Sequence, residues 1–336
     1  MANMSAPTED GVRYEAGDIV AALYRALLKR SPDREGLELH ERNLRQRGLE
    51  YVFDAFASSP EFRRGGGTAP SSLELNNSPD RMNVELRLTA DEKARLWAHV
   101  RRVWTALGET EPYWSVLTDP KFRVAGMRET DALAAFYATG AGDVSYLDAF
   151  LRRNGVRTPG KTVVAEFGCG VGRVTGWLAK RFSRVVAFDV SASHLAAARE
   201  RMHGDGAANV DFVHIEGPEG LKRLQDVDLF FSMIVLQHNP PPVMAEILDH
   251  ACRGLKPGGI AFFQAPTYAR DYAFDVKSYL EGDGQRNEME MHVIPLSEVF
   301  RILSDNDMRV IDVRQDHCVG NFDRWISNTF LARKGG

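Results

Sequence analysis

The chain has little cysteine, no lysine- or arginine-rich block and no apolar run long enough to cross a bilayer. Its three cysteines among 336 residues cannot all pair and lack metal-ligand spacing, which suits a reducing compartment. Residues 1–18 contain no apolar signal core, and a net charge of −4 without a basic block gives no electrostatic footprint for nucleic acid. We therefore expect a cytoplasmic protein with neither a membrane span nor a nucleic-acid partner.

A glycine-rich run after an apolar strand is the most informative feature that the chain does have. The predicted strand 162–167 carries a carboxylate, Glu166, near its end, and a helix is predicted over 173–182. Three glycines occupy alternate positions between the two: Gly168, Gly170 and Gly172. Glycines let a ligand touch the main chain, and a helix N-terminus offers free N–H groups. The run therefore predicts a site for a nucleotide-like ligand.

The spacing of the glycines and the carboxylate indicate which ligand this is. The dinucleotide fingerprint is G-x-G-x-x-G, and its loop holds a pyrophosphate. Here the third glycine comes one residue early, and Glu166 would repel a pyrophosphate but attract an ammonium or sulfonium group. This pattern favours S-adenosylmethionine (SAM) over NAD as the cofactor.

A second predicted strand, 184–189, ends in Asp189, which is placed to accept hydrogen bonds from both ribose hydroxyls. Ser191 then caps a helix predicted over 192–202. We interpret Cys169 as a small residue tolerated between two glycines, because methyl transfer from a sulfonium needs no covalent enzyme intermediate. The residues predicted to bind the cofactor are Glu166, Gly168, Cys169, Gly170, Gly172, Asp189, Val190 and Ser232.

Strand and helix patterns alternate through the second half of the chain. Strands are predicted near 162–167, 184–189, 210–215, 227–232 and 259–264, with a last antiparallel pair near 308–315 and 324–333. This alternation predicts a parallel sheet with helices on both faces, and right-handed crossovers bring the glycine loop and Asp189 to its carboxyl edge. The expected fold class is α/β: a Rossmann-like, doubly wound, mostly parallel seven-stranded sheet with an antiparallel last strand, preceded by a small all-helical domain.

The patterns divide the chain into four segments. Residues 15–64 are predicted to form a helical accessory or interaction domain, and 65–83, rich in glycine, serine, proline and asparagine, a flexible linker. Residues 84–158 are predicted as a helical extension that packs on the sheet and covers the cofactor site. Residues 159–336 are then the catalytic domain.

This arrangement resembles the class I SAM-dependent methyltransferases, and the resemblance continues downstream of the second strand. Residues 228–232 resemble their fourth strand, 236–238 the segment at the active-site rim, and 255–259 the turn into their fifth strand. Residues 289–292 and 325–331 resemble a subgroup associated with methylation of sugars and polysaccharides. The resemblance implies a SAM-dependent methyltransferase that methylates a hydroxyl on a sugar, a glycan or a related small molecule.

A second resemblance concerns the N-terminal segment. Residues 23–25, 30–36 and 59–62 resemble small helical domains related to phycobilisome linkers. That family implies docking on a protein partner or self-association rather than chemistry.

A hydroxyl acceptor requires help, because a hydroxyl is a poor nucleophile at neutral pH without a base or a metal. His238 follows the fourth predicted strand by a few residues, and His292 lies where this family inserts acceptor-binding segments. We predict these two histidines as the catalytic residues. Asp316, or a metal held by Glu288 and Glu290, is the alternative. We predict no metal site, because a half-buried strand explains the alternation over 288–292 equally well.

Residues 239–242 read Asn-Pro-Pro-Pro and resemble the Asn-Pro-Pro-aromatic motif with which amino-methylating enzymes hold a target amine. Here the asparagine lies several residues beyond Ser232, and proline takes the aromatic position. We therefore interpret this stretch as a helix start with Asn239 as its cap.

Two functions from other classes stay open. An NAD-dependent oxidoreductase would need a pyrophosphate loop compatible with Glu166. A catalytically silent SAM-binding scaffold would suit the linker-like N-terminal segment.

Overall fold

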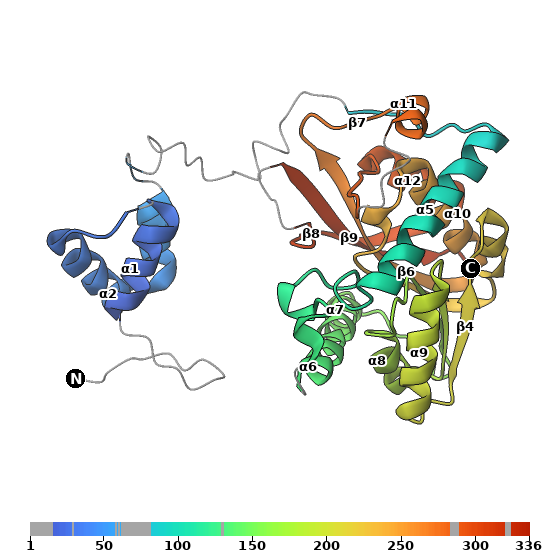
Figure 1. Cartoon of the computed structure of the whole chain (residues 1–336), viewed down its shortest axis with the longest axis horizontal. Coiled ribbons are helices and arrows are strands. Elements are labelled where there is room, and N and C mark those ends of the chain that lie inside the picture. Colours follow the sequence, from blue (N-terminus) through green and yellow to red (C-terminus); the bar gives the residue numbers. More distant parts are fainter. Residues whose placement is uncertain are drawn as a thin grey trace. The chain divides into compact units, whose positions relative to one another are not determined.

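The computed structural model describes residues 16–28, 30–57, 59, 61, 82–128, 131–282, 289–319 and 324–336. Its contacts divide the chain into two compact units, Met1–Ser78 and Pro79–Gly336. The first unit consists of helices and the second of a sheet covered by helices (Figure 1). Most of the predicted linker 65–83 lies outside the described residues. Within the described part of the chain, no helix has the length and apolar character that crossing a membrane requires.

Two helices make up the described part of the first unit: α1 (Ala16–Leu27) and α2 (Arg34–Ala57). Asp33 begins α2, and its carboxylate accepts the Gly36 N–H at 2.7 Å. The second helix bends at Gly48, which has a φ of 86°. The two helices enclose a small apolar core formed by Val20, Tyr24, Val52 and Phe56.

The second unit is built on a seven-stranded sheet with the order β4-β3-β2-β5-β6-β9-β8. The strands are β2 (Val163–Phe167), β3 (Arg184–Asp189), β4 (Val210–His214), β5 (Val227–Ser232), β6 (Leu255–Ala269), β8 (Met308–Asp316) and β9 (Trp325–Lys334). Strands β2 to β6 pair in parallel, whereas β9 is antiparallel to both β6 and β8. The predicted α/β fold with an antiparallel last strand is therefore confirmed.

Helices cover both faces of this sheet (Figure 1). They are α5 (Ala90–Thr110), α6 (Ala132–Ala138), α7 (Gly140–Arg153), α8 (Thr175–Arg181), α9 (Ala192–Gly204), α10 (Pro241–Gly254), α11 (Val276–Glu281) and α12 (Leu296–Asp305). Side chains alternate along β2, so Ala165 and Phe167 pack in one core with α5, α10 and α12, while Val164 packs in the other with α7 and α8. Both faces of the central strand are thus buried, as a parallel sheet requires.

Short elements complete the unit. They are the two-residue pair β1 (Asn83–Val84) and β7 (Ala273–Phe274), and the 3₁₀ turns η1 (Pro120–Phe122), η2 (Gly126–Arg128), η3 (Pro218–Arg223) and η4 (Leu236–His238). Because Asn83 pairs with β7, the chain is already part of the second unit at this residue.

Helix α5 crosses the sheet unit and brings an aromatic side chain to the cofactor edge. It begins with a reciprocal capping box in which Thr89 and Glu92 each bond the other's backbone N–H. Near its other end, Gly108 faces α9. A Cβ at this position would lie 2.6 Å from the Ser191 hydroxyl oxygen, so the glycine permits close contact between the two helices.

The turn predicted over 255–259 lies inside β6. The pairing of β5 with β6 jumps from Val227 opposite Leu255 to Leu229 opposite Ile260, and the intervening residues leave the regular ladder. Gly258, with a φ of 76°, lies in this irregular stretch.

Candidate active site

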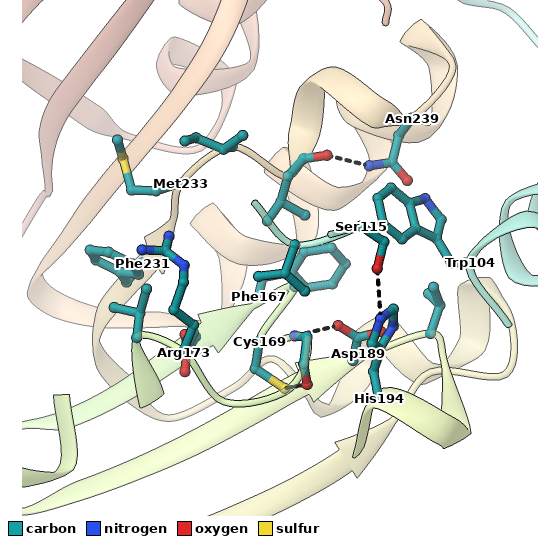
Figure 2. A pocket seen from close by; sticks show the side chains of 18 residues that line it. Trp104, Ser115, Phe167, Cys169, Arg173, Asp189, His194, Phe231, Met233 and Asn239 are labelled. Carbon is teal, nitrogen blue, oxygen red and sulfur yellow. Dashed lines mark hydrogen bonds between the residues drawn. The ribbon is translucent and has the colours of Figure 1, made fainter. Parts of the chain in front are cut away.

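A cavity lies at the carboxyl ends of β2, β3 and β5. This is the edge at which open parallel sheets bind ligands. Six residues predicted to bind the cofactor line the cavity: Glu166, Gly168, Cys169, Gly170, Asp189 and Val190. Figure 2 shows the side chains around it.

The glycine loop after β2 forms one wall, and two of its glycines are required by both backbone angle and space. Gly168 has a φ of 79°, and a Cβ there would lie 2.3 Å from Val235 Cγ1. Gly170 has a φ of 53°, and a Cβ would lie 2.6 Å from Val116 Cγ2. Any other residue would be strained at either position and would push away the valine that packs against the loop.

Asp189 holds the glycine loop from the end of β3. One carboxylate oxygen accepts the Gly170 N–H at 2.8 Å, and the other accepts the Ser191 N–H at 2.8 Å. The first of these bonds is drawn in Figure 2. A carboxylate oxygen can accept a further hydrogen bond. Asp189 can therefore fix the loop and still accept from a ligand in the cavity.

Glu166 is a buried carboxyl group with an incomplete hydrogen-bond shell. Only 3% of the residue is exposed, and no donor among the described residues bonds its Oε2. Burial raises the pKa of Glu166 to about 8. An unpartnered acceptor is costly in a folded protein, so this oxygen marks a place where a ligand donor belongs.

Arg173 is the positive counterpart of Glu166. Its Nη1 pairs with Asp143 on α7 at 2.7 Å, which anchors the side chain. Its Nε is buried and has no acceptor among the described residues. Figure 2 shows Arg173 beside Phe231, on the other side of the view from Asp189 and His194. Among the described residues, the cavity thus contains a carboxyl oxygen without a donor and a guanidinium N–H without an acceptor.

His194 lines the cavity as well, and the sequence analysis missed it. It follows the cap of α9, where nothing in the spacing distinguishes it from a helix-surface residue. Its Nε2 lies 3.0 Å from the Ser115 hydroxyl oxygen, an interaction drawn in Figure 2, and its ring contacts Trp104 on α5. Burial lowers the pKa of His194, while Asp189 opposes that shift. Trp104 and Ser115 come from the segment predicted to cover the site, and both line the cavity.

Two residues predicted to bind the cofactor do not line the cavity. A Cβ on Gly172 would contact Ala198 of α9, so Gly172 allows that helix to pack closely. The Ser232 hydroxyl donates to the Phe167 carbonyl at 3.1 Å and so joins the ends of β5 and β2. Cys169 does line the cavity, and burial raises its pKa well above the ordinary thiol value.

His238, the first predicted catalytic residue, lies behind Trp104 and does not line the cavity. Its Nδ1 bonds the Glu290 carbonyl oxygen at 2.8 Å, which fixes the proton on that nitrogen. Its Nε2 then accepts from Gln237 Nε2 at 3.1 Å. Burial lowers the pKa of His238 to about 4. Both ring nitrogens of this neutral histidine are therefore occupied.

His292, the second predicted catalytic residue, belongs to a separate cluster that we call the Glu290 cluster: His99, Tyr272, Tyr279, Glu290 and His292. Glu290 Oε2 accepts from the Tyr279 hydroxyl at 2.6 Å and from His292 Nε2 at 2.9 Å. His292 Nδ1 accepts from the Tyr272 hydroxyl at 2.9 Å. Burial opposes ionisation of Glu290, but the bonds from His292, His99 and Tyr279 hold its pKa well below the usual range.

The alternative catalytic groups are also accounted for. Asp316 accepts the Thr329 hydroxyl at 2.8 Å and the Cys318 N–H at 3.0 Å, and it does not line the cavity. Glu288 lies outside the described residues. Among those that are described, no group of three or more histidine, cysteine, aspartate or glutamate side chains is placed to hold a metal ion.

The interpretation of Asn239 as a helix cap was wrong. Pro240 occupies the cap position of α10, and its cap lacks a side-chain bond. Asn239 instead lines the cavity, and its Nδ2 donates to the Val235 carbonyl at 2.9 Å (Figure 2). Because Pro240 is the cap residue of α10, the Asn239 side chain has no capping role, and it lies at the cavity instead.

Residues 164–259 match a family model described as a methyltransferase domain, and this stretch contains the glycine loop, Glu166 and Asp189. Residues 164–259 thus form a methyltransferase domain. The residues around the cavity fit SAM as the cofactor, because SAM supplies an ammonium group for Glu166 Oε2, a carboxylate for Arg173 Nε and ribose hydroxyls for Asp189.

Curated proteins resemble parts of the methyltransferase domain. Phosphoethanolamine N-methyltransferase 1 of Triticum aestivum is 29% identical over 154 residues, which cover 40% of this chain and 30% of that protein. The probable cobalt-precorrin-6B C(15)-methyltransferase (decarboxylating) of Methanothermobacter thermautotrophicus is 33% identical over 129 residues, covering 35% of this chain and 65% of that protein. The chain thus spans less than a third of the length of the first relative.

Solved structures resemble the domain at lower identity. Magnesium protoporphyrin IX methyltransferase from Synechocystis PCC 6803 with bound SAH is 17% identical, with a TM-score of 0.49, over 71% of this chain and 99% of that chain.

Proposed function

We propose that this protein transfers a methyl group from SAM to a small-molecule acceptor. The observation that carries the proposal is the unpartnered Oε2 of Glu166 in a cavity formed by a glycine loop. When bound, SAM supplies an electrophilic methyl group on a sulfonium. A pyrophosphate would instead place negative charge beside this carboxyl group, which argues against NAD.

Three side chains would each bind a different part of the cofactor. Asp189 accepts from the ribose, Glu166 accepts from the ammonium group, and Arg173 donates to the carboxylate. Val116 and Val235 cover the glycine loop and exclude water from it. Because methyl transfer is an in-line displacement, such positioning accounts for a large part of the acceleration, up to roughly 7–11 kcal/mol in well-oriented systems.

Calorimetry with SAM, S-adenosylhomocysteine and NAD tests the cofactor assignment. We expect the first two to bind and NAD to give no heat of binding. Binding of NAD in preference to SAM would overturn the assignment. Binding of SAM without turnover on any acceptor would favour the catalytically silent scaffold.

The hydroxyl acceptor, on a sugar, a glycan or a related small molecule, rests on family resemblance, and its base is His238 or His292. To act, His238 must leave its bonds to Glu290 and Gln237, and Trp104 must move aside. If His238 is the base, His238→Ala cuts turnover by about 10²–10⁴-fold, leaves SAM affinity nearly intact and abolishes a rate loss at low pH. His292→Ala is the parallel test. Full turnover in both variants would reject a histidine base at these positions.

An amine acceptor is the second candidate, and Asn239 favours it. Its Nδ2 is bonded to backbone, so its carbonyl oxygen is the free polar group of the side chain, and Figure 2 shows it beside the Trp104 indole. An amide oxygen next to an aromatic ring suits an amine, which needs no base once it is neutral. The relative from T. aestivum is itself named as an N-methyltransferase. Under this alternative, Asn239→Ala lowers turnover on amines, whereas His238→Ala does not.

The first unit supports a proposal of docking or self-association. Leu49 and Phe53 of α2 are 53% and 47% exposed, and their spacing of four residues places them on one face of the helix. Light scattering of the full chain and of a fragment that begins at Pro79 tests self-association, and SAM calorimetry on the same fragment tests the domain boundary. An insoluble fragment, or one that does not bind SAM, would show that the boundary is wrong.

The described cysteines are all free thiols, which agrees with the cytoplasmic setting that we propose.

A further inference from the structure

Gln264 lies in β6, and its side chain is completely buried. Its Oε1 accepts the backbone N–H of Ile234 at 3.1 Å. Its Nε2 donates to Gln237 Oε1 at 3.0 Å and to Ser327 Oγ at 2.7 Å. These three partners belong to the loop after β5, to η4 and to β9. One side-chain amide therefore joins three elements around the cofactor edge of the sheet.

Ile234 has an unfavourable backbone conformation that needs support. Its φ is 59°, in the left-handed region that β-branched residues rarely adopt. The other described non-glycine residues with positive φ are all aspartates, which tolerate this region better: Asp226, Asp271 and Asp307. The hydrogen bond from the Ile234 N–H to Gln264 Oε1 is a direct restraint on the backbone at this residue.

The conformation of Ile234 determines where Val235 lies. Val235 is the next residue, and its side chain packs directly on Gly168 of the glycine loop. Ile234 and Val235 both line the cavity. A change of backbone angle at Ile234 would therefore move Val235 away from the loop that holds the cofactor.

We propose that Gln264 is a positioning residue for the cofactor site. It fixes the left-handed turn at Ile234, and this turn presses Val235 onto Gly168. The proposal rests on the proposed function in that it takes SAM as the ligand of the loop. It assigns no contact between Gln264 and the ligand, because Gln264 does not line the cavity.

A neighbouring pair offers a matched control. The Thr267 hydroxyl donates to Asn328 Oδ1 at 2.6 Å, and this bond also joins β6 to β9. Thr267 is buried like Gln264, but its side chain has no bond to the loop after β5. Thr267→Val therefore removes a buried polar link between the same two strands without releasing Ile234.

The test measures SAM affinity of the full chain by calorimetry in four forms: wild type, Gln264→Leu, Gln264→Leu with Ile234→Gly, and Thr267→Val. We expect Gln264→Leu to weaken SAM binding at least about tenfold, because the Ile234 N–H loses its partner. Glycine adopts positive φ without support, so the double variant should return to within about threefold of wild type. Thr267→Val should stay within the same range.

The outcomes separate this inference from the proposed function. If wild type does not bind SAM, the proposed function fails. If wild type binds SAM and a folded Gln264→Leu binds it equally well, or if Ile234→Gly does not restore affinity, the inference is wrong. Should Gln264→Leu fail to fold, a double variant that folds and binds SAM supports the inference, and a double variant that does neither overturns it.

Discussion

Two glutamates behave in opposite ways within this one domain. Glu166 lies in the cavity with an oxygen that has no donor, and its pKa is raised to about 8. Glu290 is surrounded by donors from Tyr279 and His292, and its pKa is held well below the usual range. Both are embedded carboxyl groups near histidines or arginines. They differ in burial, because Glu166 is 3% exposed and the Glu290 side chain 20%, and in the completeness of their hydrogen-bond shells.

The difference separates a ligand site from a structural cluster. A buried acceptor without a donor lowers the stability of the fold by about 1–3 kcal/mol. Such a group is therefore expected where a bound ligand supplies the missing donor. In the Glu290 cluster the chain itself supplies the donors, because Tyr279 and His292 both bond Glu290 Oε2. Substitutions in the two places should therefore affect different quantities.

The largest effect is expected at Arg173. Arg173→Met should weaken SAM binding roughly 100-fold, since a charge-assisted hydrogen bond contributes about 1.5–3 kcal/mol. Decarboxylated SAM, which has no carboxylate, should lose less than about threefold. Calorimetry with both ligands measures the difference. Arg153→Met, which removes the Arg153–Asp312 pair at 2.8 Å, controls for the loss of an ion pair on α7. Equal losses for the two ligands would contradict the assignment.

A loss of at least tenfold is expected for Asp189→Ala, which removes the charge-assisted acceptor for the ribose, worth about 1.5–3 kcal/mol per bond. Because Asp189 also bonds Gly170 and Ser191, circular dichroism and thermal melting must accompany the titration. Unchanged SAM affinity in a folded variant would reject the ribose contact.

A smaller effect is expected at Glu166, where the measured quantity is the number of protons released when SAM binds rather than the affinity. With its pKa near 8, the free carboxyl group is protonated at about pH 6.5 and must ionise to receive the ammonium group that SAM carries at this pH, so binding should release close to one proton. Calorimetry in buffers of different ionisation enthalpy counts the released protons. Glu166→Gln should abolish the release.

The same carboxyl group should also affect stability. The folded protein binds this proton more tightly than the unfolded chain, so the free energy of unfolding should fall as pH rises from about 4.5 to 8. In Glu166→Gln this part of the pH dependence should disappear. In the calorimetric experiment, a release of protons on SAM binding that persists in Glu166→Gln would mean that another group ionises.

The smallest effect on SAM binding is expected at Glu290. Glu290→Gln should leave the affinity within about threefold of wild type while lowering the melting temperature, because Tyr279 and His292 lose a charged acceptor. The sign of its pH dependence is the reverse of that for Glu166. A lowered pKa stabilises the fold above the unfolded value of about 4.5, and this contribution is lost as pH falls below it. A large loss of SAM affinity would place the Glu290 cluster in the cofactor site.

The sequence predicted the fold well because the relevant signals are local. The apolar runs near 184–189 and 227–232, and the cap at Ser191, need only their own neighbours to define them. The parallel pairing of the strands, with the glycine loop and Asp189 at one edge of the sheet, then followed from general rules of parallel connections. The glycine loop and Asp189 were found for the same reason: they are contiguous with these strands.

Side-chain roles could not be read in the same way, because they depend on partners that are distant in the chain. His238 is occupied by the carbonyl of Glu290, which lies 52 positions away, and His194 approaches Ser115, 79 positions away. The close contact at Gly108 likewise depends on α9, a separate element that packs against it. The prediction of Asn239 as a cap followed the local preference for asparagine at the cap and proline in the first turn, whereas Pro240 itself occupies the cap position.

The sulfur inside the glycine loop has a further consequence. SAM is an alkylating agent, and a thiolate would be a competing nucleophile at the site that holds it. Burial keeps Cys169 in the thiol form, since its pKa lies well above the ordinary value. Under the proposed function, the loop thus carries a cysteine that is a poor nucleophile toward the sulfonium of its own cofactor.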